Sequence, residues 1–308
     1  MINIKRLIFI LLIITTGFIL FLAFKNEPTK NEPMDESIQH EPKEELEEDV
    51  PTEEVQLNDT EEVVNREDPV KDFLSEKLRQ AADFFFTQDI KVVTLGDSLT
   101  EGSGDETKNG GYVGVLDDTI NRDKHVVDFQ NFAKRGSRTD QLLLRLEDEE
   151  VINALNHADI ILITIGANDI MKVFKENITD LTLEKFTAEQ NQYKQRLEQV
   201  FSTIQGFNGE ADIYLIGFYN PFKKYFADIE ELEHIVSNWN QIGLNVTEQY
   251  NNANFIPIKD IFDQAESNYF ADDNFHPNAL GYRMIAERVL QYVLNEGERD
   301  ANTEATIQ

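Results

Sequence analysis

Cysteine is absent from this chain of 308 residues, which also has only five histidines and far fewer basic than acidic side chains, 28 against 58. The lack of cysteine excludes disulfides, a thiol nucleophile, iron–sulfur clusters and zinc sites built on thiolates. The shortage of Lys and Arg leaves a formal net charge of −30. That charge argues against nucleic-acid binding, which needs clustered cations, and against adsorption to an anionic membrane surface. The sequence therefore predicts no nucleic-acid partner, no metal and no cofactor.

One long apolar run contrasts with this acidic composition. Residues 7–24 read LIFILLIITTGFILFLAF and carry no charge. As a helix this run would span roughly 27 Å, close to the thickness of a bilayer core. Lys5 and Arg6 precede it and the next stretch is acidic, so residues 1–6 are expected to stay cytoplasmic. We expect a single-pass anchor in a bacterial cell membrane, with the remaining chain extracytoplasmic.

A cleaved signal peptide is the alternative for this run. Its apolar region is normally shorter and is followed by a small-residue cleavage site, which residues 21–27 do not offer. Cleavage would make the protein secreted instead of anchored.

Residues 25–70 differ from the rest of the chain in composition. They contain 17 acidic and 4 basic side chains, five of the eight prolines, and neither glycine nor an aromatic residue. Such a segment buries too little apolar surface to offset the entropy lost on ordering. It is expected to be a disordered acidic linker, although a partner-binding acidic motif is an alternative.

From residue 71 to 296 the composition is typical of one globular domain, followed by a flexible polar tail at 297–308. Runs rich in Val, Ile and Phe predict strands, and the stretches between them, such as 139–146, 186–204 and 231–250, have helical patterns. Strands buried on both faces and separated by helices indicate a parallel α/β sheet with right-handed crossovers. The predicted strands are 90–95, 126–132, 159–165, 212–217 and 254–258.

Polar residues follow several of these strands, where ligands of an α/β sheet collect. Gly96-Asp97-Ser98-Leu99 follows the first strand, and Ser98 alone could be a helix N-cap. The third strand runs into Gly166-Ala167-Asn168-Asp169, and Asp273-Asn274-Phe275-His276-Pro277 precedes the last helix. A serine nucleophile needs a base, the base needs a carboxylate, and the tetrahedral intermediate needs hydrogen-bond donors. These blocks together supply all of those groups.

This ordered set of blocks resembles the SGNH, or GDSL, serine hydrolases over residues 88–294, and looks closest to a YpmR-like, lysophospholipase-L1-like bacterial subgroup. The resemblance implies a flavodoxin-like three-layer α/β/α sandwich with a five-stranded parallel sheet. It implies Ser98 as nucleophile, His276 as general base and acid, and Asp273 as the residue that orients His276. The backbone N–H groups of Ser98 and Gly136 and the Asn168 amide would form the oxyanion hole.

Two features differ from the family pattern or go beyond it. Lys134 and Arg135 stand before Gly136 in a stretch that the family usually fills with small or apolar residues, and Arg138 is a third cation beside them. They either relieve repulsion in an acidic domain or bind an anionic group of the substrate. Aromatic residues after the fourth strand either line an acyl pocket or belong to the core or a lid; these are Tyr219, Phe222, Tyr225 and Phe226.

The expected activity is hydrolysis of carboxylic esters or thioesters through an acyl-serine, on a small-molecule, lipid or glycan ester. Lysophospholipid deacylation and O-deacetylation of cell-wall glycans are the two alternatives within this class. From another class, the domain could be a catalytically silent binding module. The sequence does not indicate an oligomeric state.

Overall fold

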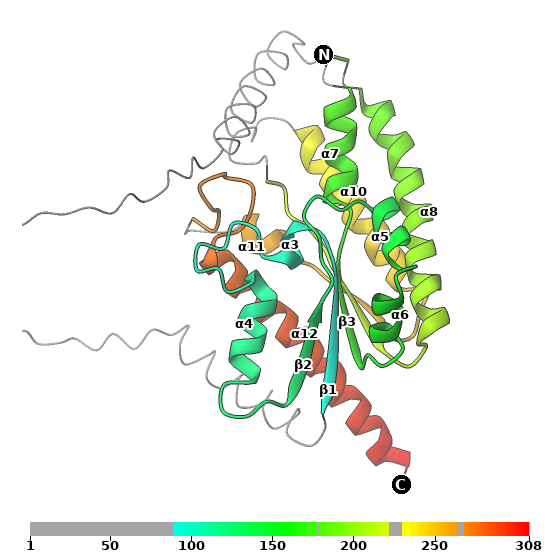
Figure 1. The fold of residues 1–308 in the computed structure, drawn as a ribbon. Coiled ribbons are helices and arrows are strands. Elements are labelled where there is room, and N and C mark those ends of the chain that lie inside the picture. The colour runs from blue at the N-terminus through cyan, green and yellow to red at the C-terminus, as the bar shows by residue number, and fades with distance from the viewer. Residues whose placement is uncertain (1–88, 178, 181, 222–229, 264–267, 308) are drawn as a thin grey trace, which may run out of the picture. The chain divides into compact units, whose positions relative to one another are not determined.

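The computed structural model describes residues 89–177, 179–180, 182–221, 230–263 and 268–307, which form an α/β fold around one parallel sheet (Figure 1). The strands lie in the order β2-β1-β3-β4-β5, and each neighbouring pair is parallel. This is the flavodoxin-like order. The five predicted strands are confirmed to within two residues at each end; they are β1 (Ile90–Gly96), β2 (Val127–Asn131), β3 (Ile160–Thr164), β4 (Asp212–Ile216) and β5 (Ala253–Ile256).

Helices cover both faces of this sheet and make the three-layer arrangement that the family resemblance implied (Figure 1). One face carries α5 (Thr139–Arg145), α6 (Glu149–Leu155), α7 (Ala167–Glu176), α8 (Leu183–Phe207) and α10 (Glu230–Thr247). The other face carries α3 (Ser98–Glu101), α4 (Gly111–Ile120), α11 (Lys259–Asp263) and α12 (Ala279–Ile307).

The strand sequences explain this sandwich. Side chains of a strand alternate between the two faces, so Ile161 and Ile163 of β3 pack against the α5–α10 layer while Ile160 and Leu162 pack against the α4–α12 layer. All five residues of β3 are buried. A strand that is covered on both faces reads as a continuous apolar run, and no solvent-facing polar position interrupts it.

The carboxyl ends of the central strands are level with one another. Gly96 at the end of β1 pairs with Thr164 at the end of β3, and Thr164 pairs with Ile216 at the end of β4. The chain leaves β1 for β2 and β3 for β4, on opposite sides, so β1 and β3 form the switch point where ligands of such sheets bind. Ser98 and Asn168 follow these two strands.

The C-terminus differs from the sequence prediction. Helix α12 continues to Ile307 through the residues that the sequence assigned to a flexible tail. Residues 298–307 contain no proline and include Glu, Arg and Ala, which favour helix, so Gly297 does not end the helix.

Three predicted segments, 1–6, 7–24 and 25–70, lie outside the described residues, and so does the predicted domain start at residue 71. Within the part of the chain that the structure describes, no helix has the length and apolarity needed to cross a membrane.

Candidate active site

Ser98 is held at the first position of the short helix α3, directly after β1. The strand leaves the sheet through Gly96 at φ 145°, where a Cβ would lie 2.4 Å from the Thr164 carbonyl oxygen. Only glycine fits there without displacing β3. Asp97, and not Ser98, is the N-cap: its carboxylate accepts a hydrogen bond from the Leu99 N–H at 3.0 Å. The Ser98 hydroxyl is therefore not engaged in capping.

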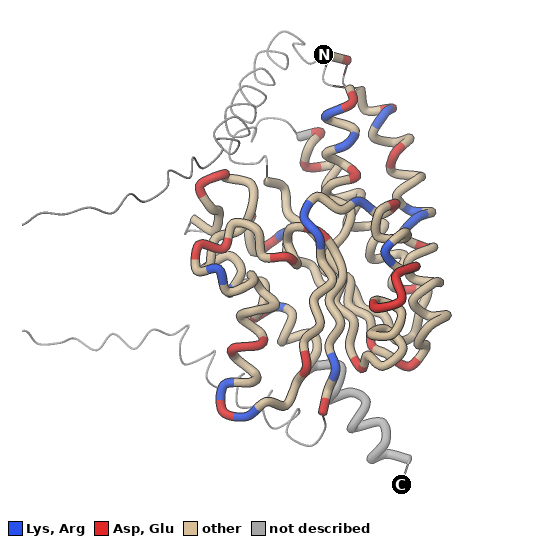
Figure 2. Tube along the Cα trace, viewed as in Figure 1, with Lys and Arg blue, Asp and Glu red and all other residues tan. Residues whose placement is uncertain are grey.

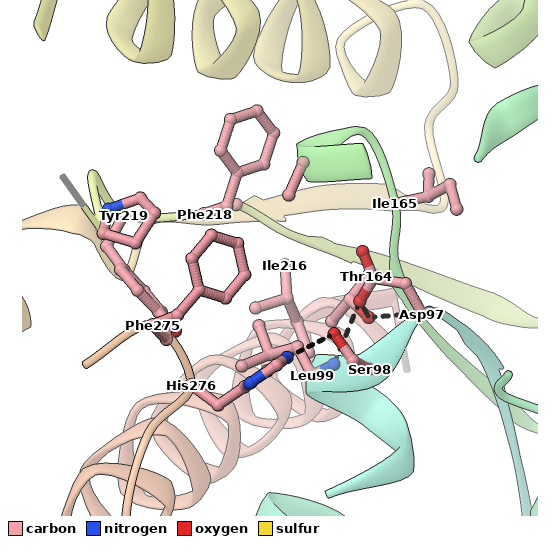
Figure 3. Close-up of a pocket in the computed structure, with 13 residues that line it drawn as sticks. Asp97, Ser98, Leu99, Thr164, Ile165, Ile216, Phe218, Tyr219, Phe275 and His276 are labelled. Carbon is pink, nitrogen blue, oxygen red and sulfur yellow. Dashed lines mark hydrogen bonds between the residues drawn. The ribbon is translucent and has the colours of Figure 1, made fainter. Parts of the chain in front are cut away.

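His276 reaches Ser98 from the loop before α12, 178 residues further along the chain (Figure 3). Asp273 belongs to the same loop. His276 Nε2 lies 3.0 Å from Ser98 Oγ, and His276 Nδ1 lies 2.6 Å from Asp273 Oδ2. The other Asp273 oxygen accepts the backbone N–H groups of Phe275 and His276. Asp273, and not the neighbouring Asp272, is the carboxylate that contacts the imidazole. The structure thus brings together the three residues that the sequence singled out.

The electrostatics of this trio suit a serine nucleophile. Partial burial pushes the pKa of Asp273 up, but hydrogen bonds from the His276 side chain and from two backbone N–H groups outweigh it and lower that pKa to about 2. Asp273 is therefore charged at neutral pH and accepts the Nδ1 proton. This arrangement leaves Nε2 of the neutral imidazole as an acceptor for the Ser98 hydroxyl proton.

The three residues expected to form the oxyanion hole follow the carboxyl ends of neighbouring strands, and they differ in whether their N–H groups have protein acceptors. Gly136 lies in an exposed loop at φ 77°. Among the described residues, neither its N–H nor that of Ser98 has a hydrogen-bond acceptor. The Asn168 amide nitrogen instead donates to Asp97 Oδ2 at 3.2 Å and to the Ser137 carbonyl at 3.1 Å. Two of the three donors are thus open, and the third has protein acceptors.

The three cations near Gly136 also differ. Arg138 forms an ion pair with Asp140 at 2.9 Å, as expected of a residue that relieves local repulsion. Lys134 and Arg135 are exposed, and within the described part of the chain their side chains have no carboxylate partner. Figure 2 shows fewer basic than acidic residues in the part of the chain that the structure describes.

A small apolar pocket that is open to solvent lies beside Ser98 and His276 (Figure 3). The ends of β3 and β4 supply most of its walls, and its apolar lining includes Leu99, Ile165, Ile216, Phe218, Tyr219 and Phe275. Tyr219 lines it, as one sequence alternative proposed, and its hydroxyl donates to the Phe275 carbonyl at 2.8 Å. Phe222, Tyr225 and Phe226 lie outside the described residues.

A buried ion-pair network behind Asn168 was missed by the sequence analysis. Asp169 is fully buried and accepts the Thr139 N–H at 3.1 Å and the Thr139 hydroxyl at 2.6 Å. Arg196 of α8 bonds both Asp169 and Thr139. This network ties the start of α7, which carries Asn168, to the start of α5, which follows the Gly136 loop. The acidic residue after Asn168 was visible in the sequence, but nothing there indicated Arg196 as its partner.

Asp97 was also given no role by the sequence analysis. The residue is only 4% exposed, and its carboxylate accepts hydrogen bonds from the Asn168 amide and from the Thr164 hydroxyl, the latter at 3.1 Å. An Asp directly before a helix is a usual N-cap signal, and that signal could have identified the capping. The contacts to Thr164 and Asn168 span 67 and 71 residues and required the fold.

No group of His, Asp and Glu within the described residues is arranged to hold a metal ion. The donors at this edge of the sheet are a hydroxyl, an imidazole, amides and backbone N–H groups, which are the groups used for acyl transfer by a serine.

Comparisons with known proteins agree with this geometry. The model of the GDSL-like Lipase/Acylhydrolase family matches residues 94–284. The uncharacterized protein YpmR of Bacillus subtilis is 37% identical over 227 residues, covering 72% of this chain and 89% of that protein. The spore germination lipase LipC of Bacillus licheniformis is 28% identical over 212 residues, covering 65% and 94%.

Among solved structures, the lipase Lip_vut3 from a goat rumen metagenome has the same fold, with a TM-score of 0.57 at 22% identity, covering 65% of this chain and 95% of that one. The family match covers more than half of the chain and includes Ser98 and Asn168 after β1 and β3 and His276 in the loop before α12. The chain therefore belongs to the GDSL-like Lipase/Acylhydrolase family and is a hydrolase of the esterase and lipase type.

Proposed function

We propose that this hydrolase cleaves carboxylic esters or thioesters through an acyl-enzyme on Ser98. The observation that carries the proposal is the continuous hydrogen-bonded series from Ser98 Oγ through His276 to Asp273, at 3.0 and 2.6 Å. Ser98 Oγ attacks the carbonyl carbon while His276 Nε2 takes its proton, and the carbonyl electrons move onto the oxygen. Collapse of this tetrahedral intermediate expels the alcohol or thiol, which His276 protonates. Water then attacks the acyl-serine, with His276 again as base, and releases the acid.

Asp273 keeps the imidazole in the tautomer that this sequence of steps needs, and it stabilises the imidazolium that forms. The open N–H groups of Ser98 and Gly136 support their role as donors to the oxyanion. Asn168 supplies the third donor through the amide hydrogen that bonds the Ser137 carbonyl, which the oxyanion would share.

The apolar pocket supports an acyl chain longer than acetyl as the acid part of the substrate. Its side chains other than Asp97, Ser98, Thr164 and His276 present mainly hydrocarbon or aromatic surface, and each buried methylene of a ligand contributes about 0.8 kcal/mol. This favours lipase-type or lysophospholipase-type substrates over acetylated glycans.

Lys134 and Arg135 are proposed to contact an anionic group on the leaving group of the substrate. Their exposure and the lack of a carboxylate partner among the described residues support this role, while the pairing of Arg138 with Asp140 argues for a structural role there. Charge reversal at Arg135 should raise KM for a phosphate-bearing ester and leave KM for a neutral ester unchanged. An equal rise for both esters would remove the assignment.

We further propose that residues 7–24 anchor the protein in the membrane, with the hydrolase domain extracytoplasmic on the 25–70 linker. The uncharged run after Lys5 and Arg6 supports this proposal. N-terminal sequencing of protein from the membrane fraction tests it. Material that starts near residue 25 would establish cleavage and a secreted enzyme.

Labelling with a fluorophosphonate probe tests the proposed chemistry. Full-length protein should be labelled on Ser98, while folded Ser98→Ala and His276→Ala variants should not be. A panel of esters from acetyl to long acyl chains, together with acetylated wall polymers, then separates lipase-type activity from O-deacetylation. Absence of labelling on folded wild-type protein would favour a silent binding module.

A further inference from the structure

The carboxylate of Asp97 is surrounded by hydrogen-bond donors from three parts of the fold, of which Figure 3 shows Leu99 and Thr164. Its Oδ1 atom accepts from the Leu99 N–H at 3.0 Å and from the Thr164 hydroxyl at 3.1 Å. Its Oδ2 atom accepts from the Asn168 amide at 3.2 Å. Asp97 thus connects the helix that carries the nucleophile with the side chain proposed to stabilise the oxyanion.

Behind Asp97 a series of buried hydroxyls continues into the core. Thr164 Oγ1 lies 2.7 Å from Thr100 Oγ1, which lies 2.8 Å from the Tyr112 hydroxyl. All three side chains are at most 2% exposed. Since a charged carboxylate only accepts hydrogen bonds, Thr164 must donate to Asp97, Thr100 to Thr164, and Tyr112 to Thr100. Every hydroxyl proton in the series then points toward Asp97, and such aligned bonds strengthen one another.

We infer that the hydroxyl series Tyr112–Thr100–Thr164 holds Asp97 ionised and fixed, so that Asp97 acts as a positioning residue for the Asn168 amide. The inference rests on the proposed function, in which Asn168 donates to the oxyanion. One amide hydrogen, on Asp97 Oδ2, fixes the plane of the amide. The second, which the Ser137 carbonyl accepts, is the hydrogen that the oxyanion would share. A protonated Asp97 would lose acceptor capacity and release this orientation.

Burial and the groups around Asp97 act in opposite directions on its pKa. Burial raises its pKa to about 6, against the lowering effect of the Leu99 N–H, the Thr164 hydroxyl and the nearby His276; the Asp169 charge raises that pKa further. The other titratable groups that face Asp97 are phenols, Tyr112 of α4, Tyr193 of α8, Tyr219 after β4 and Tyr282 of α12. Because the hydroxyl donors favour the charged form, removing one must raise the pKa of Asp97.

Each hydroxyl of the series can be removed separately by a substitution. Thr164→Val removes the direct donor with little change of shape, and Tyr112→Phe removes the most remote one. Tyr282→Phe is the matched control, because Tyr282 is also a fully buried tyrosine of the same core, but its hydroxyl donates to the Ser103 carbonyl outside the series. The readouts are the pH profile of kcat/KM on a p-nitrophenyl ester and the ¹³C NMR titration of Asp97 in protein labelled at Asp carboxyls, assigned with Asp97→Asn.

We expect Thr164→Val to move the Asp97 titration upward by about one pH unit, since a hydrogen bond to a charged group is worth about that much. The acid limb of the profile, to which His276 also contributes as the general base, should move in the same direction by a smaller amount. Tyr112→Phe should move both by a smaller amount, and Tyr282→Phe should move neither. Unchanged titration in Thr164→Val, or an equal shift in Tyr282→Phe, would overturn the inference. A wild-type protein that hydrolyses no ester would instead refute the proposed function, and the NMR titration would still test the series.

Discussion

Replacing Arg196 by methionine tests the buried network behind Asn168. The Arg196 guanidinium lies 3.0 Å from Asp169 Oδ1 and also bonds Glu189 and Thr139. Asp169 is completely buried, so this substitution leaves a carboxylate without its countercharge. Glu189 keeps Lys172 at 3.5 Å, and Asp169 keeps both hydrogen bonds from Thr139. Methionine fills much of the space of the arginine stem, so the lost charge dominates the effect.

The magnitude follows from these remaining contacts. Removing one partner of a buried ion pair costs about 3–5 kcal/mol, and the surviving Thr139 bonds place this case at the low end, about 3 kcal/mol. For a domain of this size that is a fall in Tm of about 6–12 °C. Lys194→Met is the matched control on the same helix, because the exposed pair of Lys194 with Glu198 at 3.8 Å is worth less than about 0.5 kcal/mol.

The pH dependence separates this explanation from lost packing. Burial raises the pKa of Asp169, and Arg196 lowers it, so the variant must raise that pKa further. A raised carboxyl pKa favours the protonated form in the folded state, so stability is lost as the pH rises through it. The deficit of Arg196→Met relative to wild type should therefore shrink as urea denaturation is moved from pH 8 to pH 5. A deficit that is constant with pH, or one matched by Lys194→Met, would refute the reasoning.

Three further predictions concern the site and its loops. Asn168→Ala should lower kcat by roughly 10²–10³ with little change in KM, as loss of an oxyanion donor does; unchanged turnover would remove Asn168 from that role. Gly104→Ala should reduce both stability and kcat, because φ is 92° at this position and the new Cβ would lie 2.7 Å from the Cβ of His276. The control Gly206→Ala lies in open space in α8 and should stabilise the protein by up to about 1 kcal/mol. Equal effects of the two substitutions on Tm would contradict the steric argument. The lowered pKa of Asp273, about 2, contributes folding stability that is present above about pH 4 and is lost as the pH falls toward 2. Because the side chain is 41% exposed, Asp273→Asn should remove only about 1 kcal/mol of this pH-dependent stability. The free energy of unfolding measured across an acid titration checks this value.

Much of the fold follows from local patterns in the sequence. The central strands β3 and β4 were visible as short apolar runs, because a strand covered on both faces has no polar alternation, whereas the edge strand β2 alternates apolar and polar residues. The Asp273–His276 contact was also accessible, since a spacing of three residues within one loop brings both side chains to the same side. Helix α12 was the exception at the C-terminus, where polar composition suggested a tail although the residues favour helix.

Contacts between distant strand ends could not be read in this way. Asn168 was expected to be an open donor, yet its amide has acceptors in Asp97 and Ser137, 71 and 31 residues away. Whether such side chains meet depends on the register between β1 and β3 and on the loop after β2. Neither quantity leaves a periodic signal in the sequence.

The sequence by itself determined the α/β class, the family, and the residue types of a serine hydrolase at the strand ends, because hydrophobic periodicity and short motifs act over a few residues. The tertiary structure alone decided which buried groups surround them. The series from Tyr112 to Asp97 and the pair of Asp169 with Arg196 join segments from separate helices and strands. Burial and hydrogen-bond geometry, which set the pKa of Asp97 and Asp169, exist only once those segments are packed together.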